Sequence, residues 1–118
     1  MGEGDKFDQS WRDSIEAHYL HWTRGRPANQ IQLAFRNHWL TFQEIIGDRL
    51  PGKRALEVGC GRGSLSAYFA DDGWNCTLLD ISPAAIDLAR RAFDRQSLSA
   101  SLDVGDCLAL PYPDASFD

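Results

Sequence analysis

The chain has 118 residues, 43% of them hydrophobic and 25% charged, so it can bury one modest core, and we expect no second independent domain. A formal net charge of -5 at pH 7 gives no general attraction to nucleic-acid phosphates or anionic lipid, and it favours a small-molecule partner. The polar start lacks a secretory signal, and no apolar run approaches the roughly 20 residues of a membrane span. These features predict a cytoplasmic protein that binds neither nucleic acid nor membrane.

The cysteine and histidine residues predict neither a metal site nor a disulfide. Three cysteines, Cys60, Cys76 and Cys107, are odd in number and far apart, which argues against a disulfide framework and a zinc site. We expect them to be reduced thiols that mostly contribute to packing. His18 and His21 are three positions apart and could face one metal, but no third ligand accompanies them, so no metal site is expected.

Residues 1–48 hold nearly all the tryptophan and histidine and contain no strand-like run, so we expect an N-terminal helical cap. An aromatic stripe from Trp11 to Trp22 predicts one helix packed against the core. Apolar residues then recur at roughly helical spacing from Asn29 to Ile46, and Gly47 can cap the end. This second pattern predicts a helix of about 16 residues.

From residue 49 onward, short apolar runs alternate with helical segments, which is typical of βαβ units in a mainly parallel sheet. The last of these helices has a clear start, because Ser82 can cap it and Pro83 suits the first helical position. Residues 107–118 read as a loop. The expected elements, in chain order, are a strand at Arg54–Val58, a helix at Ser64–Ala70, a strand at Asn75–Leu79, a helix from Pro83 and a strand at Ser99–Val104.

The first strand runs into a turn with three alternating glycines, Gly59, Gly61 and Gly63, and then into a helix. Glycine accepts positive φ and lets a ligand approach the main chain, while the helix N-terminus offers free N–H groups and a positive dipole end. The arrangement suits a nucleotide-like ligand. Taken by itself, it also fits a plain tight turn.

Asp80 ends the second strand, 21 residues after Gly59. That separation is close to the roughly 20 residues expected for an acid that binds ribose hydroxyls. An alternative is that Asp80 only caps the helix that begins near Ser82, and the two roles are compatible.

Four motifs in order resemble those of the class I S-adenosylmethionine-dependent methyltransferases, of the methyltransferase type 11-like kind. The first is the G-x-G-x-G turn, preceded two residues earlier by Glu57. The second is the D-x-S-P segment Asp80–Pro83, and the third is Gly105–Cys107. The fourth, Leu110–Asp118, is similar to the family's L-P-F-x-D-x-S-F-D.

This resemblance implies S-adenosylmethionine as cofactor and a role for each matched residue. Glu57 would lie near the amino group of the cofactor's methionine part, above a floor formed by the glycines. Asp80 would accept bonds from the two ribose hydroxyls. Asp106 would meet the exocyclic amine of adenine, with the Cys107 N–H near the ring, although Asp106 alone also fits an Asx-type turn. The implied cofactor-binding set is Glu57, Gly59, Cys60, Gly61, Gly63, Asp80, Ile81, Asp106 and Cys107.

The resemblance also implies a doubly wound, Rossmann-like α/β fold, of which this chain would hold the first half. Residues 1–48 would be the cap, and residues 49–118 the cofactor-binding half, ending where a fourth strand should begin beside the first. The first strand would then be a sheet edge, through which self-association is expected. The 118-residue chain is expected to show no methyl-transfer activity by itself.

The implied reaction is transfer of a methyl group to an oxygen, nitrogen or carbon nucleophile of a small-molecule acceptor, and no catalytic residue is assigned. Tyr19 and Arg36 could reach the cofactor or acceptor pocket from the cap. Two alternatives stay open. One is a non-catalytic protein that binds S-adenosylmethionine, and the other is an NAD-dependent oxidoreductase, which Ser64 at the last position of the dinucleotide fingerprint fits poorly.

Overall fold

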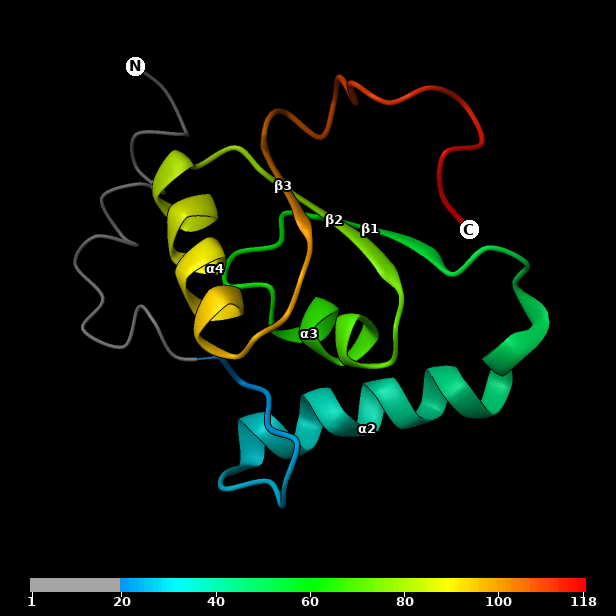
Figure 1. Cartoon of the computed structure of the whole chain (residues 1–118), viewed down its shortest axis with the longest axis vertical. Helices are drawn as coiled ribbons and strands as arrows, with labels where there is room; N and C mark the ends of the chain where they lie inside the picture. Colours follow the sequence, from blue (N-terminus) through cyan, green and yellow to red (C-terminus); the bar gives the residue numbers. More distant parts are fainter. Residues whose placement is uncertain (1–19) are drawn as a thin grey trace.

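A computed structural model describes residues 20–118. Its strands form one parallel sheet in the order β1-β2-β3, with Arg54 opposite Asn75 and Thr77 opposite Ser101. The elements shown in Figure 1 are α2 (Gln30–Ile45), η1 (Gly47–Arg49), β1 (Arg54–Val58), α3 (Ser64–Asp71), β2 (Asn75–Asp80), α4 (Pro83–Arg95) and β3 (Ser101–Val104). The predicted α/β class with a parallel sheet is therefore confirmed.

The helices and the C-terminal segment lie on different faces of the sheet. Both crossovers step in the same direction, from β1 to β2 and from β2 to β3, so right-handed connections place α3 and α4 on one face. Figure 1 shows α2 next to α3 on that side and the segment after β3 on the other. The Tyr112 hydroxyl fastens this segment to β3 by donating to the Asp103 carboxylate at 2.6 Å.

An aromatic cluster packs α2 against α3. The Trp39 ring is buried, stacks on Phe42 at 5.8 Å and meets Phe69 edge-on at 4.7 Å. Phe69 in turn meets Trp74, just before β2, at 5.2 Å. Large rings in such edge and offset contacts contribute strongly to a small core, so this cluster fixes α2 on the helical face. Among residues 20–118, no helix is long and apolar enough to cross a membrane.

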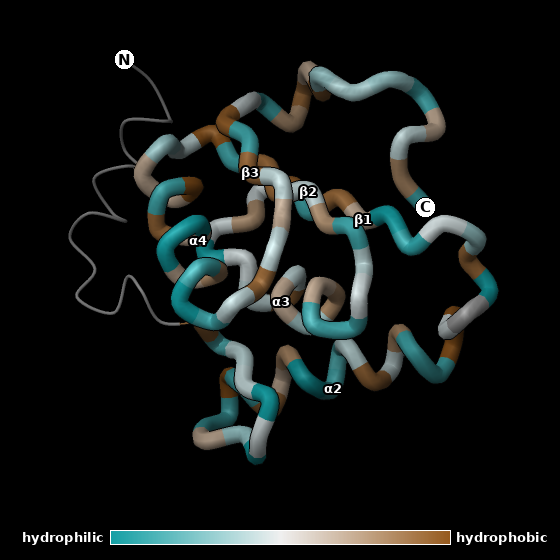
Figure 2. The backbone as a smooth tube through the Cα atoms, in the orientation of Figure 1, coloured by the Kyte–Doolittle hydropathy of each residue, from teal (hydrophilic) through white to brown (hydrophobic). Residues whose placement is uncertain are grey.

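The predicted α2 agrees with the structure to within one residue at each end. Asn29 caps the N-terminus, where its side chain accepts from the Gln32 N–H at 2.9 Å. Ile46 caps the C-terminus, and Gly47, with φ of +51°, follows and opens η1. The alternation of hydrophilic and hydrophobic residues that predicted this helix can be followed along α2 in Figure 2.

Two predicted boundaries were wrong. The third strand begins at Ser101 and not at Ser99, because the chain is still closing α4 there: Ser97 has a φ of +56° and the Leu98 N–H donates to the Phe93 carbonyl at 2.9 Å. The helix predicted from Trp11 lies mostly outside the described residues, and its last part, 20–22, is not helical.

Tertiary contacts explain the conformation at residues 20–22. Trp22 is buried edge-on against Tyr68 of α3, with ring centroids 6.4 Å apart. The His21 N–H donates to the Ser64 hydroxyl at 3.0 Å and not to a helical carbonyl. Packing on α3 therefore overrides the helical periodicity of the aromatic stripe.

Candidate functional site

The carboxyl ends of the three strands bring the predicted residues to one edge of the sheet. β1 leads into Gly59, β2 ends at Asp80, and Asp106 follows β3. Main-chain bonds join these ends, because the Gly59 N–H donates to the Leu79 carbonyl at 2.8 Å and the Gly105 N–H to the Asp80 carbonyl at 3.0 Å. This edge is where parallel α/β sheets bind ligands.

The glycine-rich turn serves packing at one end and leaves open space at the other. Gly63 has a φ of +78°, and a Cβ there would lie 2.5 Å from Leu78 and 3.0 Å from Phe93, so glycine allows α3 to approach the sheet. Gly59 has a φ of +67°, but a Cβ there would meet nothing within 4 Å. Close packing alone therefore explains the glycine at position 63. At position 59 the glycine leaves room for a ligand against the main chain.

Asp80 joins the glycine-rich turn to the start of α4. Its Oδ2 accepts from the Gly61 N–H and its Oδ1 from the Ser82 N–H, each at 2.9 Å. The cap of α4 is Ser82, whose hydroxyl accepts from the Ala85 N–H at 3.1 Å. Asp80 is therefore not the helix cap, and each carboxylate oxygen keeps a second lone pair for another donor.

Glu57 projects from β1 towards α3. Its Oε1 accepts from the Ser66 hydroxyl at 2.5 Å and from the Ser66 N–H at 3.3 Å. Burial raises the pKa of the Glu57 carboxyl above its ordinary value, and the Ser66 bonds oppose that rise. A partly desolvated carboxylate of this kind gains from a cation placed beside it.

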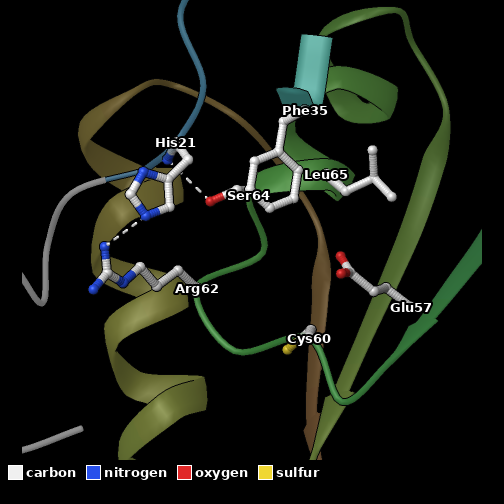
Figure 3. A pocket seen from close by; sticks show the side chains of 7 residues that line it. All are labelled: His21, Phe35, Glu57, Cys60, Arg62, Ser64 and Leu65. Atoms are coloured by element: carbon white, nitrogen blue, oxygen red, sulfur yellow. Dashed lines mark hydrogen bonds between the residues drawn. The ribbon is translucent and has the colours of Figure 1, made fainter. Parts of the chain in front are cut away.

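A cavity of about 280 Å³ lies between this carboxylate, the glycine-rich turn and the N-terminal segment (Figure 3). Sequence reasoning assigned only the acidic and cysteine members of its lining to the site. His21 and Phe35 could not be recognised, because they reach the turn only when α2 and the chain before it pack on α3, whereas the other members follow the turn directly in sequence. The lining residues are His21, Phe35, Glu57, Cys60, Arg62, Ser64 and Leu65.

Cys60 lines this cavity, and its thiol is not reactive. Burial raises the pKa of its thiol to about 12, so the sulfur is a neutral thiol at physiological pH. Its Sγ donates to the Gly61 carbonyl at 3.5 Å. The free thiols of Cys60 and Cys76 are buried, and that of Cys107 is exposed.

The remaining predicted residues form the open rim. Asp106 is exposed, and its Oδ1 accepts from the Leu108 N–H at 2.9 Å, which is the Asx-type turn that its sequence context allowed. Its Oδ2 has no donor among residues 20–118. Ile81 is 37% exposed next to Asp80. The rim therefore presents a carboxylate oxygen and an apolar side chain along the same edge as Gly59.

Of the candidates from the cap, Arg36 does not join this site. Arg36 lies along a second groove, of about 180 Å³, together with Trp22 and Tyr68. Tyr19 and His18 lie outside the described residues. Within residues 20–118, no group of three histidine, cysteine, aspartate or glutamate side chains could hold a metal ion.

Comparison with known proteins places the sequence among methyltransferases. A model of the family described as a methyltransferase domain matches residues 55–118. The malonyl-[acyl-carrier protein] O-methyltransferase of Serratia marcescens is 36% identical over 83 residues, which are 64% of this chain and 31% of that protein. Norajmaline N-methyltransferase of Rauvolfia serpentina is 38% identical over 121 residues, which cover 98% of this chain and 39% of that protein. The chain thus spans about a third of the length of these relatives.

Solved structures share the fold. The [4+2]-cyclase SpnF aligns with a TM-score of 0.71 and 27% identity, over 98% of this chain and 46% of that one. The tRNA (uracil-54, C5)-methyltransferase of Pyrococcus abyssi, solved with S-adenosyl-L-homocysteine, aligns with a TM-score of 0.52 and 25% identity, over 62% of this chain and 18% of that one.

Proposed function

Because the chain belongs to the methyltransferase domain family, we propose that it forms the cofactor-binding part of a class I methyltransferase and binds S-adenosylmethionine. The observation that carries the proposal is the juxtaposition of Gly59, Asp80 and Asp106 at one sheet edge, in the order of the family's motifs. The S-adenosyl-L-homocysteine held by the Pyrococcus abyssi relative supports the choice of ligand.

The residues present fit this cofactor. The open space above Gly59 admits a ligand to the main chain, and the adjoining Cys60, Gly61 and Gly63 complete the floor of the turn. The Asp80 carboxylate accepts from the two ribose hydroxyls through the lone pairs that Gly61 and Ser82 leave to it. Charge-assisted bonds of this type are about twice as strong as neutral ones, so Asp80 sets the position of the sugar.

The two ends of the cofactor are assigned to the remaining residues. Glu57 holds the ammonium group of the methionine part, which offsets the cost of burying its own carboxylate. At the other end, Asp106 accepts from the exocyclic amine of adenine through Oδ2, while the Cys107 N–H donates to the ring and Ile81 packs beside it. These roles keep the reactive sulfur between the two ends.

When bound, the cofactor would supply a methyl group on a positively charged sulfur, for transfer to an oxygen, nitrogen or carbon of a small-molecule acceptor with neutral S-adenosylhomocysteine as the leaving group. The part played by the described residues is to bind and orient, because fixing two reactants at near-attack distance lowers the barrier by up to about 7–11 kcal/mol. The division into a cap over residues 1–48 and a cofactor-binding part over residues 49–118 belongs to the same proposal. No residue is assigned as the base.

Self-association through the open edge of β1 is a further part of the proposal. β1 is an outer strand, and on its free side the Asp118 N–H donates to the Arg54 carbonyl at 2.8 Å. The Asp118 carboxylate also pairs with the Arg54 guanidinium at 3.1 Å. Among residues 20–118, the rest of that edge has no main-chain partner and could pair with a second strand. Sedimentation at increasing protein concentration is expected to show a growing dimer fraction, and a monomer at all concentrations would contradict it.

Two experiments test the function. In equilibrium binding, the chain is expected to bind S-adenosylhomocysteine and not NADH, and the reverse result would favour an oxidoreductase. Methyl transfer from labelled S-adenosylmethionine to a mixed metabolite extract then separates catalysis from binding. Binding without transfer, in a longer protein that contains this chain, would favour a binding-only role. This second test is needed because SpnF, described as a cyclase, shares the fold.

A further inference from the structure

The segment that follows β3 is fastened to both outer strands of the described sheet. At β3, the Tyr112 hydroxyl donates to the Asp103 carboxylate at 2.6 Å. At β1, the Arg54 guanidinium donates to the Asp118 carboxylate and to the Ala115 carbonyl, each at 3.1 Å. Figure 1 shows this segment on the face of the sheet that α3 and α4 leave open. Of these anchors, Tyr112 is the nearest to β3, and Arg54 holds the far end.

The bond between Tyr112 and Asp103 is short and charge-assisted. Burial and the neighbouring Asp103 raise the pKa of the Tyr112 hydroxyl to about 12, so it is a neutral donor at physiological pH. The Tyr112 ring meets Phe117 edge-on, with ring centroids 5.2 Å apart, and both rings are half-buried. The family pattern L-P-F-x-D-x-S-F-D has phenylalanine at this position. The ring contact therefore suits either residue, whereas the bond to Asp103 requires the tyrosine.

The turn at Asp106 depends on its two ends for its place on the sheet. Its own bonds are local, such as that from the Leu108 N–H to Asp106 Oδ1 at 2.9 Å. Among residues 20–118, residues 106–111 have no hydrogen bond to any strand, and all of them are exposed. The turn is therefore located by Gly105, whose N–H donates to the end of β2 at 3.0 Å, and by Tyr112 on its other side.

We propose that Tyr112 is a positioning residue: through its bond to Asp103, it holds the turn so that Asp106 meets the exocyclic amine of adenine. The inference rests on the proposed function and adds to it a residue that sets the choice of purine. Without the bond, the next anchor after Gly105 is Ala115, so a longer span is free and more conformations compete with the productive one. A ligand that relies on Asp106 then loses affinity, because its binding must also order the turn.

The test compares two ligands that differ in one group of the purine. S-adenosylhomocysteine carries the exocyclic amine, whereas S-inosylhomocysteine carries a carbonyl oxygen there and offers no donor to Asp106. The wild-type chain is expected to bind S-adenosylhomocysteine at least about tenfold more tightly, and Tyr112→Phe should reduce this preference by at least about threefold. The affinity of the variant for S-inosylhomocysteine should change by less than about twofold. Calorimetric titration with both ligands measures the preference.

Two variants of Asp103 identify the bond as the cause. Asp103→Ala removes the acceptor and should reduce the preference as far as Tyr112→Phe does, and combining the two should add nothing, because both break the same bond. Asp103→Asn keeps an acceptor oxygen and should retain most of the preference. If an Asp103 variant does not fold, Tyr112→Phe, which keeps the ring contact with Phe117, carries the test.

Tyr68→Phe is the matched control. It removes a hydroxyl from α3, on the helical face of the sheet, where Tyr68 donates to the Gln32 carbonyl at 3.5 Å, and it should leave the preference unchanged. If Tyr112 served stability alone, Tyr112→Phe would lower the melting temperature and keep the wild-type preference for adenine. The preference is therefore the readout that separates positioning from stability.

The possible failures are distinguishable. An equal loss for both ligands, or an undiminished preference in Tyr112→Phe, would overturn this inference and leave the proposed function standing. Equal wild-type affinity for the two ligands would remove the adenine contact of Asp106 and this inference with it, but not the binding of the cofactor. If the wild-type chain binds neither ligand, the proposed function itself fails.

Discussion

Asp80 has a structural and a binding role, and substitution can separate them. Asp80→Ala should weaken S-adenosylhomocysteine binding by at least about tenfold, and it should also lower the free energy of unfolding by about 1–2 kcal/mol because the Gly61 and Ser82 N–H groups lose their acceptor. Ser82→Ala removes the α4 cap and should cost about 1 kcal/mol without changing affinity. Calorimetric titration and urea denaturation measure both quantities. Equal losses of affinity in the two variants would mean that Asp80 acts only through the fold.

Gly63 and Gly59 share a backbone conformation and differ in their surroundings. Gly63→Ala should destabilise by about 2–4 kcal/mol, because left-handed strain of about 1–2 kcal/mol adds to overpacking against Leu78 and Phe93. Gly59→Ala should incur the strain alone, yet weaken S-adenosylhomocysteine binding, since its methyl group points into open space. Urea denaturation of both variants gives the difference. Equal destabilisation would contradict the account of the turn.

The buried Glu57 should produce a defined pH dependence. Because burial raises its pKa in the folded protein above 4.5, its contribution to stability is fully present below 4.5 and is lost as the pH rises through the raised pKa. Glu57→Gln removes this loss, so the variant should gain stability relative to wild type across that window, with a constant difference above it. Urea denaturation of both proteins from about pH 4 to about pH 8 measures the difference. A difference that is independent of pH would show that the carboxyl is not desolvated.

At the scale of elements, α2 is held by its inner face. Trp39 is 8% exposed within the aromatic cluster, whereas Leu40, the next residue, is 46% exposed. Trp39→Ala should therefore cost about 3–5 kcal/mol of unfolding free energy, and Leu40→Ala less than about 1 kcal/mol. Urea denaturation compares the two, and similar losses would mean that α2 is not anchored by the cluster of Trp39, Phe42, Phe69 and Trp74.

Elements with strong local signals could be predicted from the sequence. The start of α4 followed from Ser82 and Pro83, and the glycine-rich turn from its spacing, because both depend on neighbouring residues. The conformation around Trp22 and the start of β3 could not be predicted, since they depend on contacts with α3 and on the closure of α4. Long-range packing carries no local sequence signal.

At the scale of the whole molecule, one part of the candidate site could be predicted from the sequence and another part could not. Its edge residues were named from the sequence, because the topology of a parallel sheet places the carboxyl ends of β1, β2 and β3 side by side. The cavity residues were not assigned to this site: His21 was considered only as a metal ligand and Phe35 not at all, because they lie 41 and 27 positions before Arg62 and meet it only in the folded chain. Arg62 itself stands between two glycines of the motif, which was the one signal that could have indicated it.

Amide chemical-shift mapping of the isotopically labelled chain during titration with S-adenosylhomocysteine tests the central claim most directly. The account predicts saturable shifts at residues 57–64, 80–82 and 105–107, with α2's outer face and the exposed face of α4 unchanged. NADH added at the same concentrations should leave the spectrum as it was. Shifts confined to other parts of the sheet, or a response to NADH at these same amides and none to S-adenosylhomocysteine, would contradict the assignment of this edge as a site for S-adenosylmethionine.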